Sequence, residues 1–156
     1  MLGASILLAS KRRWTEVVCL VIGLALVYAA VHITKGAIDR PRPAGSLIDT
    51  SLSSYPSGHA AYATVWIAVA VVLTRRLGLV ASGTLVFVAI GIAAAVGLSR
   101  IYLRAHYWSD VAGGWGIGCG IFAALAVIAL VVDYIRNNEG EPDPDSPEHR
   151  LSHAQQ

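Results

Sequence analysis

Four long apolar stretches constrain the fold of this chain more than any other feature of its sequence. They run from Trp14 to Thr34, from Gly58 to Thr74, from Leu79 to Leu98 and from Trp108 to Ile135. A helix needs about 20 apolar residues to cross the hydrocarbon core of a bilayer. Helices suit that environment because each one satisfies its own backbone hydrogen bonds. We therefore expect an all-α, polytopic membrane bundle with about four full transmembrane helices.

The two ends of the chain differ from these stretches. Residues 1–10 are apolar but too short to span a bilayer, and Lys11, Arg12 and Arg13 follow them. We expect an N-terminal stub there, either a short interfacial piece or the end of a helix whose beginning is missing. Residues 137–156 are rich in acidic residues and proline and nearly devoid of apolar ones, which predicts a flexible acidic tail. The expected division is a membrane domain at 1–136 and a tail at 137–156.

The overall composition limits the classes of partner that the chain is expected to bind. The chain of 156 residues is 55% hydrophobic and 14% charged, with a mean hydropathy of +0.59, which indicates a membrane protein. Its net charge of +2 comes from scattered basic residues, so we expect no nucleic acid partner. Cys19 and Cys119 lie inside apolar runs and are expected to be packing residues rather than a disulfide or a metal site. The sequence carries no signal for the oligomeric state.

Three polar clusters interrupt the apolar pattern. The first runs from Lys35 to Pro43, the second from Tyr55 to His59, and the third holds Ser99 and Arg100 followed by His106 and Asp110. If the four spans alternate in direction, all three clusters fall at the same end of the bundle. We therefore expect them to converge on one site.

The residue types in these clusters indicate a phosphate pocket. Lys35, Arg42 and Arg100 supply three cations, and the planar guanidinium fork of arginine suits the oxygens of a phosphoryl group. Ser57 and Gly58 lie at an expected helix start, where free backbone N–H groups and the helix dipole attract anions. We expect these five residues to bind phosphate.

Two histidines flank the expected pocket. Asp110 lies four residues after His106, so on a helix its carboxylate can accept a hydrogen bond from one ring nitrogen and leave the other bare as a nucleophile. We assign nucleophilic attack to His106 and proton donation to His59, which has no carboxylate at helical spacing. The reverse assignment is also physically allowed. No cluster offers the carboxylates of a Mg²⁺ site, so we expect neither a metal nor a cofactor.

Other polar residues near the clusters have more ordinary expected roles. We expect His32 to be structural, and Asp39 to pair with a nearby arginine. Arg40 and Arg104 are either further phosphate ligands or solvated cations. Five glycines crowd the start of the last stretch, where we expect close helix packing rather than ligand binding; they are Gly113, Gly114, Gly116, Gly118 and Gly120.

The three clusters closely resemble the signature of the type 2 phosphatidic acid phosphatase (PAP2) family. The matching residues are Lys35, Arg42 and Pro43, then Pro56, Ser57, Gly58 and His59, then Ser99, Arg100, His106 and Asp110. The resemblance implies that the cations, the helix-start residues and His59 hold or protonate the phosphate. It also implies that His106 becomes phosphorylated with the support of Asp110. Membrane members of the family usually have six spans, so the chain is expected to be a shortened homologue, a fragment, or the phosphatase portion of a longer or fused protein, with any missing or fused helices before Met1.

The resemblance leaves alternatives open. Vanadium-dependent haloperoxidases share the signature, and a non-catalytic membrane module would bind anionic lipid heads with the same cations. A lipid phosphatase is favoured because of the apolar spans and because His106 and Asp110 stand at the required spacing. Its substrate would be a lipid phosphate such as undecaprenyl pyrophosphate, phosphatidylglycerol phosphate or phosphatidic acid.

Basic residues outside the clusters predict the orientation in the inner or plasma membrane. With alternating spans, one face of the membrane would carry Lys11, Arg12, Arg13, Arg75, Arg76, Arg136 and Arg150. The positive-inside rule places that face in the cytoplasm. The active site would then face the periplasm or cell exterior, which favours a carrier lipid of the undecaprenyl pyrophosphate type.

Overall fold

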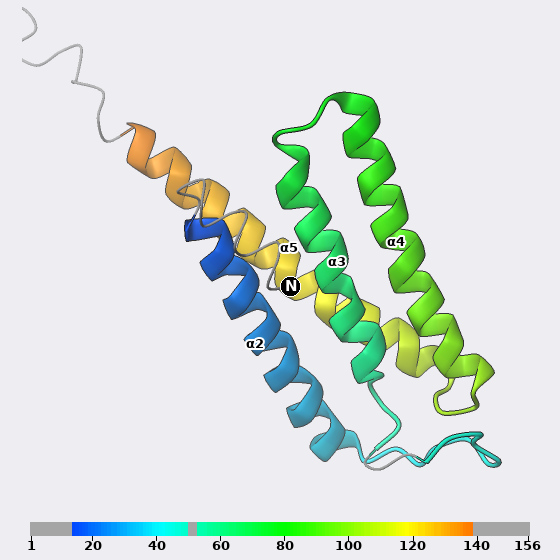
Figure 1. Ribbon diagram of the computed structural model, residues 1–156. Coiled ribbons are helices and arrows are strands. Elements are labelled where there is room, and N and C mark those ends of the chain that lie inside the picture. The colour runs from blue at the N-terminus through cyan, green and yellow to red at the C-terminus, as the bar shows by residue number, and fades with distance from the viewer. Residues whose placement is uncertain (1–13, 50–52, 139–156) are drawn as a thin grey trace, which may run out of the picture. The chain divides into compact units, whose positions relative to one another are not determined.

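The computed structural model describes residues 14–49 and 53–138, and these residues form helices and no strand. The helices are α2 (Trp14–Ile38), α3 (Gly58–Thr74), α4 (Leu79–Tyr102) and α5 (Trp108–Asn138), as Figure 1 shows. The expected all-α class is confirmed. The expected N-terminal stub lies outside the described residues, and so does the acidic tail from residue 139 onward.

Three of the helices extend beyond their apolar stretches. Each helix begins at the expected residue, but α2, α4 and α5 end three or four residues later than the apolar pattern does. In α2 and α4 the extension places a basic side chain in the last turn, Lys35 in α2 and Arg100 in α4. A cation is favourable there because it faces the negative end of the helix dipole. Both cations are thereby held at helix ends.

The helices differ in whether they are long enough to cross a membrane. Within the described residues, Trp14–Ile38, Leu79–Tyr102 and Trp108–Arg136 are long and apolar enough to do so. The fourth helix, α3, has only 17 residues and is a shorter apolar helix. Its length of about 25 Å falls short of a hydrocarbon core of about 30 Å. By length, three helices meet the expectation of about four full spans, and α3 is shorter than the other three.

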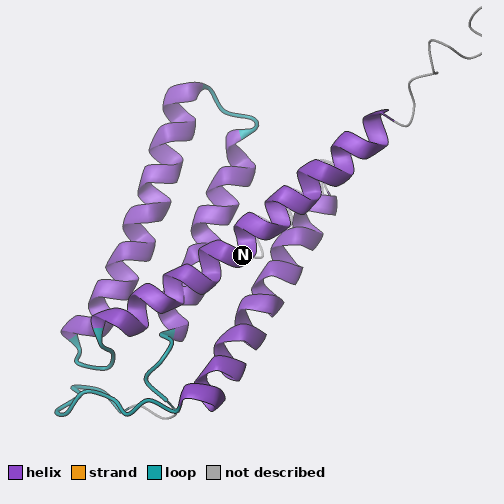
Figure 2. Cartoon of the chain, turned by 180° about the vertical axis from the view of Figure 1, so that it is seen from behind, coloured by secondary structure: helices purple, strands orange, loops and turns teal. Residues whose placement is uncertain are grey.

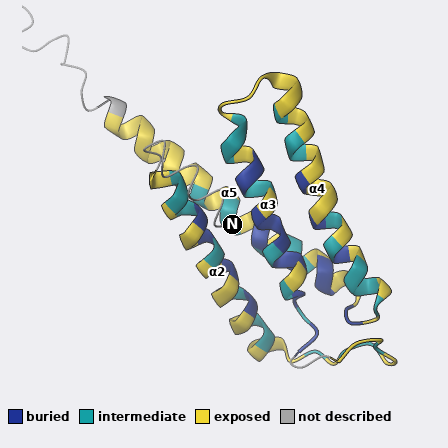
Figure 3. Cartoon of the chain, viewed as in Figure 1, coloured by how far each residue is buried: buried dark blue, intermediate teal, exposed yellow. Residues whose placement is uncertain are grey.

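α3 is the most buried of the helices α2, α3 and α4, as the dark blue of Figure 3 shows. Small residues such as Ala60 and Ala61 lie along it and allow neighbouring backbones to come close. Val27 and Val31 of α2 pack against Ala61 in a fully buried cluster. Large apolar side chains elsewhere point outward, as in Phe87, which is 78% exposed. A bilayer suits such a surface, because lipid tails solvate apolar side chains.

Glycines allow close contacts of α5 with its neighbours. A Cβ at Gly114 would lie 2.5 Å from the carbonyl oxygen of Ser57, and one at Gly118 would clash with Oγ1 of Thr64. Gly113 is similarly close to the ring of Tyr55. The expected close helix packing is confirmed at Gly114 and Gly118, whereas Gly113 meets a residue of the loop before α3. At the other two, Gly116 and Gly120, a Cβ would meet nothing within 4 Å.

The chain divides into two compact units, residues 1–123 and 124–156. The second unit contributes the last part of α5, from residue 124 to 138, whose apolar side chains are largely exposed. All three polar clusters lie in the first unit. The predicted boundary between residues 136 and 137 stays a prediction.

Two loops meet at one end of the first unit, as Figure 2 shows. One joins α2 to α3 and the other joins α4 to α5, and the N–H of Leu47 in the first donates to the carbonyl oxygen of Leu103 in the second at 3.1 Å. Gly45 and Arg104, one in each loop, both have positive φ angles. The alternating helices therefore bring the three polar clusters to the same end, as expected.

Candidate active site

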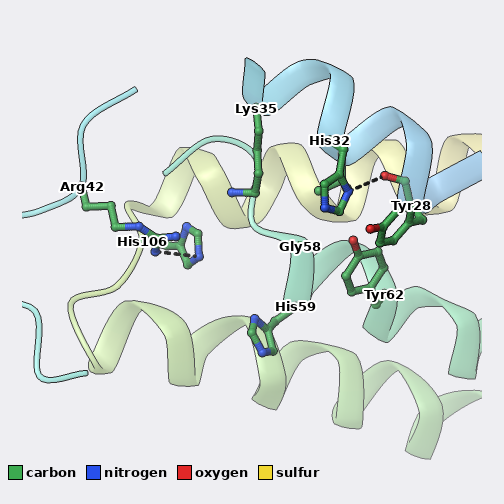
Figure 4. A pocket seen from close by; sticks show the side chains of 9 residues that line it. Tyr28, His32, Lys35, Arg42, Gly58, His59, Tyr62 and His106 are labelled. Atoms are coloured by element: carbon green, nitrogen blue, oxygen red, sulfur yellow. Dashed lines mark hydrogen bonds between the residues drawn. The ribbon is translucent and has the colours of Figure 1, made fainter. Parts of the chain in front are cut away.

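Two cavities of about 300 and about 220 Å³ lie where the three clusters meet. Arg42, His59 and His106 line both cavities, so the cavities share a wall. The larger one is also lined by Lys35 and Gly58, and the smaller one by Arg100. The structure thus brings most of the expected site residues around one space. Figure 4 shows the larger cavity, with Lys35 from α2 and His59 from α3.

His106 is held firmly by its surroundings. The side chain is buried, and its Nδ1 donates a hydrogen bond to the carbonyl oxygen of Ser54 at 2.7 Å. Because a carbonyl only accepts, the proton lies on Nδ1, and Nε2 keeps its lone pair. Nη1 of Arg42 donates to the carbonyl oxygen of Ala105 at 2.8 Å and also, at 3.4 Å, to the lone pair of Nε2. Figure 4 shows the guanidinium beside the ring.

The electrostatics of this pocket keep His106 neutral. Burial, and then the positive charge of Arg42, lower the pKa of His106 to about 4. Both effects disfavour the imidazolium form. At neutral pH Nε2 therefore carries no proton, which is the form of the ring that can attack phosphorus once the long hydrogen bond from Arg42 is released.

Asp110 orients His106 in a different way from the one expected. Its Oδ2 lies 3.6 Å from Nδ1 of His106, which is beyond a hydrogen bond. The fully buried carboxylate instead accepts hydrogen bonds from the Ser54 hydroxyl, from the N–H of Tyr107 at 2.8 Å and from Nη1 of Arg40 at 2.8 Å. Asp110 thus fixes the segment whose carbonyl holds the ring. The expected direct hydrogen bond from ring to carboxylate is wrong, because Ser54 occupies that position.

Arg40 is one of two arginines, with Arg104, that sequence reasoning left unresolved. Its Nη1 donates to Asp110 and, at 2.7 Å, to Oγ of Ser109, and its guanidinium lies 4.4 Å from the ring centre of Tyr107. Arg40 therefore ties the loop after α2 to the start of α5. Asp110, rather than Asp39, is the carboxylate that pairs with it. A separation of 70 residues between the partners leaves no local spacing signal that would have revealed the pair.

His59 has the opposite environment to His106. It lies in the first turn of α3, is exposed, and has no hydrogen-bond partner within residues 14–49 and 53–138. Both cavities reach its side chain. The ring is therefore available to a group that enters from outside the protein.

The two residues expected at the helix start differ in their access to the site. Gly58 lines the larger cavity, whereas Ser57 is fully buried and lines neither cavity. The N–H of Ser57 donates to the carbonyl oxygen of Asp110 at 2.9 Å, and its hydroxyl has no hydrogen-bond partner among the described residues. Its role in phosphate binding stays a prediction, without a cavity contact to support it.

The remaining cations complete the site. Nζ of Lys35 donates to the carbonyl oxygen of Ser53, and Nε of Arg100 donates to Oγ of Ser99 at 3.2 Å. Among the described residues, no group of three or more His, Cys, Asp and Glu side chains is arranged to hold a metal ion. Lysine and arginine supply the positive charge around the cavities, and the carboxylate of Asp49 also lines the smaller one.

Comparison with known proteins agrees with this arrangement. The family model of the PAP2 superfamily matches residues 16–134. Phosphatidylglycerophosphatase B of Bacillus subtilis is 36% identical over 94 residues, which are 58% of this chain and 46% of that protein. The chain thus spans less than half the length of this curated relative.

A solved structure shares the fold. It is the crystal structure of a transmembrane PAP2 type phosphatidylglycerolphosphate phosphatase from Bacillus subtilis, with a TM-score of 0.73 and 24% identity. The match covers 84% of this chain and 69% of the other. Because the family model matches most of the sequence and the polar clusters meet in one site, this chain belongs to the PAP2 superfamily.

Proposed function

We propose that this chain is an integral-membrane lipid phosphatase that works through a phosphohistidine on His106. The observation that carries the proposal is the hydrogen bond from Nδ1 of His106 to Ser54, which leaves Nε2 unprotonated at the wall shared by the two cavities. There Nε2 accepts one long hydrogen bond, from Arg42. Lysine and arginine side chains surround that nitrogen. Such a site suits a phosphoryl group, whose oxygens need positive charge while phosphorus is attacked.

In the first step, Lys35, Arg42 and Arg100 bind the phosphoryl oxygens. Nε2 of His106 attacks phosphorus while the bond from phosphorus to the lipid oxygen breaks, and His59 donates a proton to that oxygen. The products are a lipid alcohol, or a lipid monophosphate where the substrate is a pyrophosphate, and a phosphorylated His106. The phosphorylated ring is cationic, and the Ser54 carbonyl and the nearby Asp110 stabilise that charge.

In the second step, His59 removes a proton from water, and the water oxygen attacks phosphorus. The phosphorus–nitrogen bond breaks, which releases inorganic phosphate and restores neutral His106 with its proton on Nδ1. One histidine acts as acid and then as base, as microscopic reversibility requires when the same site forms and hydrolyses a covalent intermediate. No step needs a metal.

A lipid is the proposed substrate because the cavities lie at the ends of helices whose outer faces are apolar and exposed. The candidates are undecaprenyl pyrophosphate, phosphatidylglycerol phosphate and phosphatidic acid. The similarity to a protein named phosphatidylglycerophosphatase B supports phosphatidylglycerol phosphate among them. This support outweighs the preference for a carrier lipid, which rests on orientation alone.

Phosphate release from these three lipids by the purified chain in detergent tests the proposal. We expect release from at least one lipid in the presence of EDTA, inhibition by orthovanadate, and a phosphohistidine trapped on His106 by rapid acid-free quenching. Binding of the lipids without any release would support the non-catalytic membrane module instead. Release that requires added Mg²⁺ would contradict the mechanism.

We also propose that the site faces the periplasm or cell exterior, as the distribution of basic residues predicts. Single cysteines at Ser46, in the loop after α2, and at Gly78, before α4, test this in a variant without Cys19 and Cys119. The two positions lie at opposite ends of α3 and α4. In intact cells, a membrane-impermeant maleimide should label the cysteine at Ser46 and spare the one at Gly78. The reverse pattern would place the site in the cytoplasm.

A further inference from the structure

The larger cavity continues past the phosphate-binding cations along α2 and α3. Tyr28 and His32 of α2 and Tyr62 of α3 line it there, and Figure 4 shows their side chains on that side of the cavity. The rings of Tyr28 and Tyr62 lie 6.3 Å apart and nearly parallel, and those of Tyr28 and His32 lie 4.0 Å apart. The proposed mechanism uses none of these three side chains.

Each of these side chains has a hydrogen-bonding group that no described residue of the protein satisfies. The hydroxyls of Tyr28 and Tyr62 have no hydrogen-bond partner in the part of the chain that the structure describes. Nδ1 of His32 donates to the carbonyl oxygen of Tyr28 at 2.9 Å, which leaves Nε2 as an acceptor. Two donors and one acceptor thus border a cavity in the apolar part of the chain. A polar group without a partner is costly in lipid, so a partner that enters the cavity would lower the free energy.

Their depth argues against a role as ordinary interfacial anchors. Tyrosines that anchor a helix at the membrane surface lie near its ends. Tyr28, in contrast, is close to Leu26, the midpoint of the 25-residue α2. Its side chain is 57% exposed. Polar side chains at such a depth usually serve a substrate or an ion.

Their spacing from Lys35 indicates what the partner is. His32 and Tyr28 precede Lys35 by three and seven residues, so all three lie on one face of α2, with Tyr28 about 10 Å deeper than the phosphate-binding amine. A lipid held by its phosphate at Lys35 would place its next atoms beside these groups. In a glycerolipid those atoms include glycerol and ester oxygens, whereas a prenyl phosphate has only hydrocarbon there.

We propose that Tyr28, His32 and Tyr62 form a subsite for the glycerol and ester oxygens of a glycerolipid phosphate. The tyrosine hydroxyls donate to ester carbonyls, and Nε2 of His32 accepts from a glycerol hydroxyl where the lipid carries one. The subsite rests on the proposed phosphatase function for the position of the phosphate. It selects glycerolipid phosphates over prenyl phosphates.

Binding of two non-hydrolysable phosphonates to the full chain in detergent micelles tests the subsite. One is the phosphonate analogue of phosphatidic acid and the other is farnesyl phosphonate. Each lost hydrogen bond weakens binding by about fivefold. The double variant Tyr28→Phe with Tyr62→Phe should therefore reduce the preference for the glycerolipid analogue by about tenfold or more. Tyr102→Phe, which removes a hydroxyl from an exposed residue outside both cavities, should leave that preference as it is.

Equal weakening for both phosphonates, or no weakening for either, would overturn the subsite. The wild-type protein is assayed in parallel for phosphate release from lipid substrates. Release combined with an unaltered preference in the double variant would mean that the subsite alone fails. A shifted preference without release from any lipid would mean that the subsite stands and the phosphatase proposal fails.

Discussion

The surroundings of His106 and of His59 differ although both residues line the same two cavities. His106 is buried, bonded to Ser54 through Nδ1 and flanked by Arg42. The side chain of His59 is exposed and has no hydrogen bond to another side chain or backbone group within the described ranges. The protein itself fixes the orientation of the His106 ring, whereas the His59 ring is not held by a hydrogen bond from the described residues.

This difference matches the two proposed roles. A nucleophile must point a lone pair at phosphorus, so its orientation has to be fixed in advance. A proton donor meets an oxygen that arrives with the substrate, so its partner is absent from the protein itself. The contrast teaches that one pocket can hold one histidine side chain by a network and leave the other without a protein partner. The following variants test it, from the largest expected effect to the smallest.

His106→Ala should abolish turnover, with a loss of at least about a thousandfold in kcat, because it removes the nucleophile. Phosphate release from the best lipid substrate measures the loss. Gel filtration in detergent checks that the variant keeps the elution volume of the wild-type protein. Near-normal release by this variant would contradict the proposed covalent intermediate.

His59→Asn should slow release from a lipid substrate by about 10²- to 10⁴-fold, the usual contribution of a general acid. The loss should be much smaller for the first step with a soluble ester such as para-nitrophenyl phosphate, measured as the burst of nitrophenol in a single turnover, because that leaving group needs no proton. Comparison of the two substrates separates acid catalysis from simple damage to the site. An equal loss on both would assign His59 to phosphate binding instead.

Asp110→Asn and Arg40→Gln should each reduce kcat by about 10- to 100-fold, less than loss of either histidine, because neither residue supplies the nucleophile or the proton donor. The two residues share one ion pair, so the double variant should lose much less than the product of the single losses. Arg76→Gln, an exposed residue at the other end of α3, serves as the control. Fully multiplicative losses in the double variant would show that the pair does not act as a unit.

Acid pH should affect His106 only well below the usual histidine range. Since its pKa is lowered to about 4, Nε2 keeps its lone pair as pH falls from neutral and becomes protonated only near that value. In the variant Arg42→Gln, removal of the neighbouring charge should raise that pKa. Nitrogen NMR of histidine-labelled protein in detergent follows the titration. A midpoint of His106 near the ordinary histidine value of about 6.5 in the wild-type protein would contradict the proposed neutral pocket.

The apolar pattern and the three clusters predicted most of the architecture. Helix starts at Gly58, Leu79 and Trp108 follow directly from where the apolar stretches begin, and alternation of the spans brings the clusters to one end. Helix ends were less predictable, because polar residues such as Lys35 can continue a helix beyond its apolar part. The short length of α3 is visible in the sequence, but its burial depends on neighbours that no local pattern specifies.

The composition of the site was predictable, and its connections were not. The short spacing between His106 and Asp110 suggested a direct bond, yet the ring is held by Ser54, which is 52 residues away. The pair of Arg40 and Asp110 and the contact of Tyr28 with Tyr62 likewise join residues far apart along the chain. Such pairs depend on how loops and helices pack, which spacing along the chain does not encode.

The close approach of α5 to α3 at Gly114 has a consequence for how this protein tolerates mutation. The backbone of Gly114 lies against the carbonyl of Ser57. The N–H of Ser57 in turn donates a hydrogen bond to the carbonyl oxygen of Asp110. A side chain at this glycine would push the start of α3, which carries His59, away from the first turn of α5, which carries Asp110. In a library of variants at position 114, we therefore expect no substitution that destabilises the protein and leaves its activity intact. Every accepted replacement there would have to preserve packing and chemistry together.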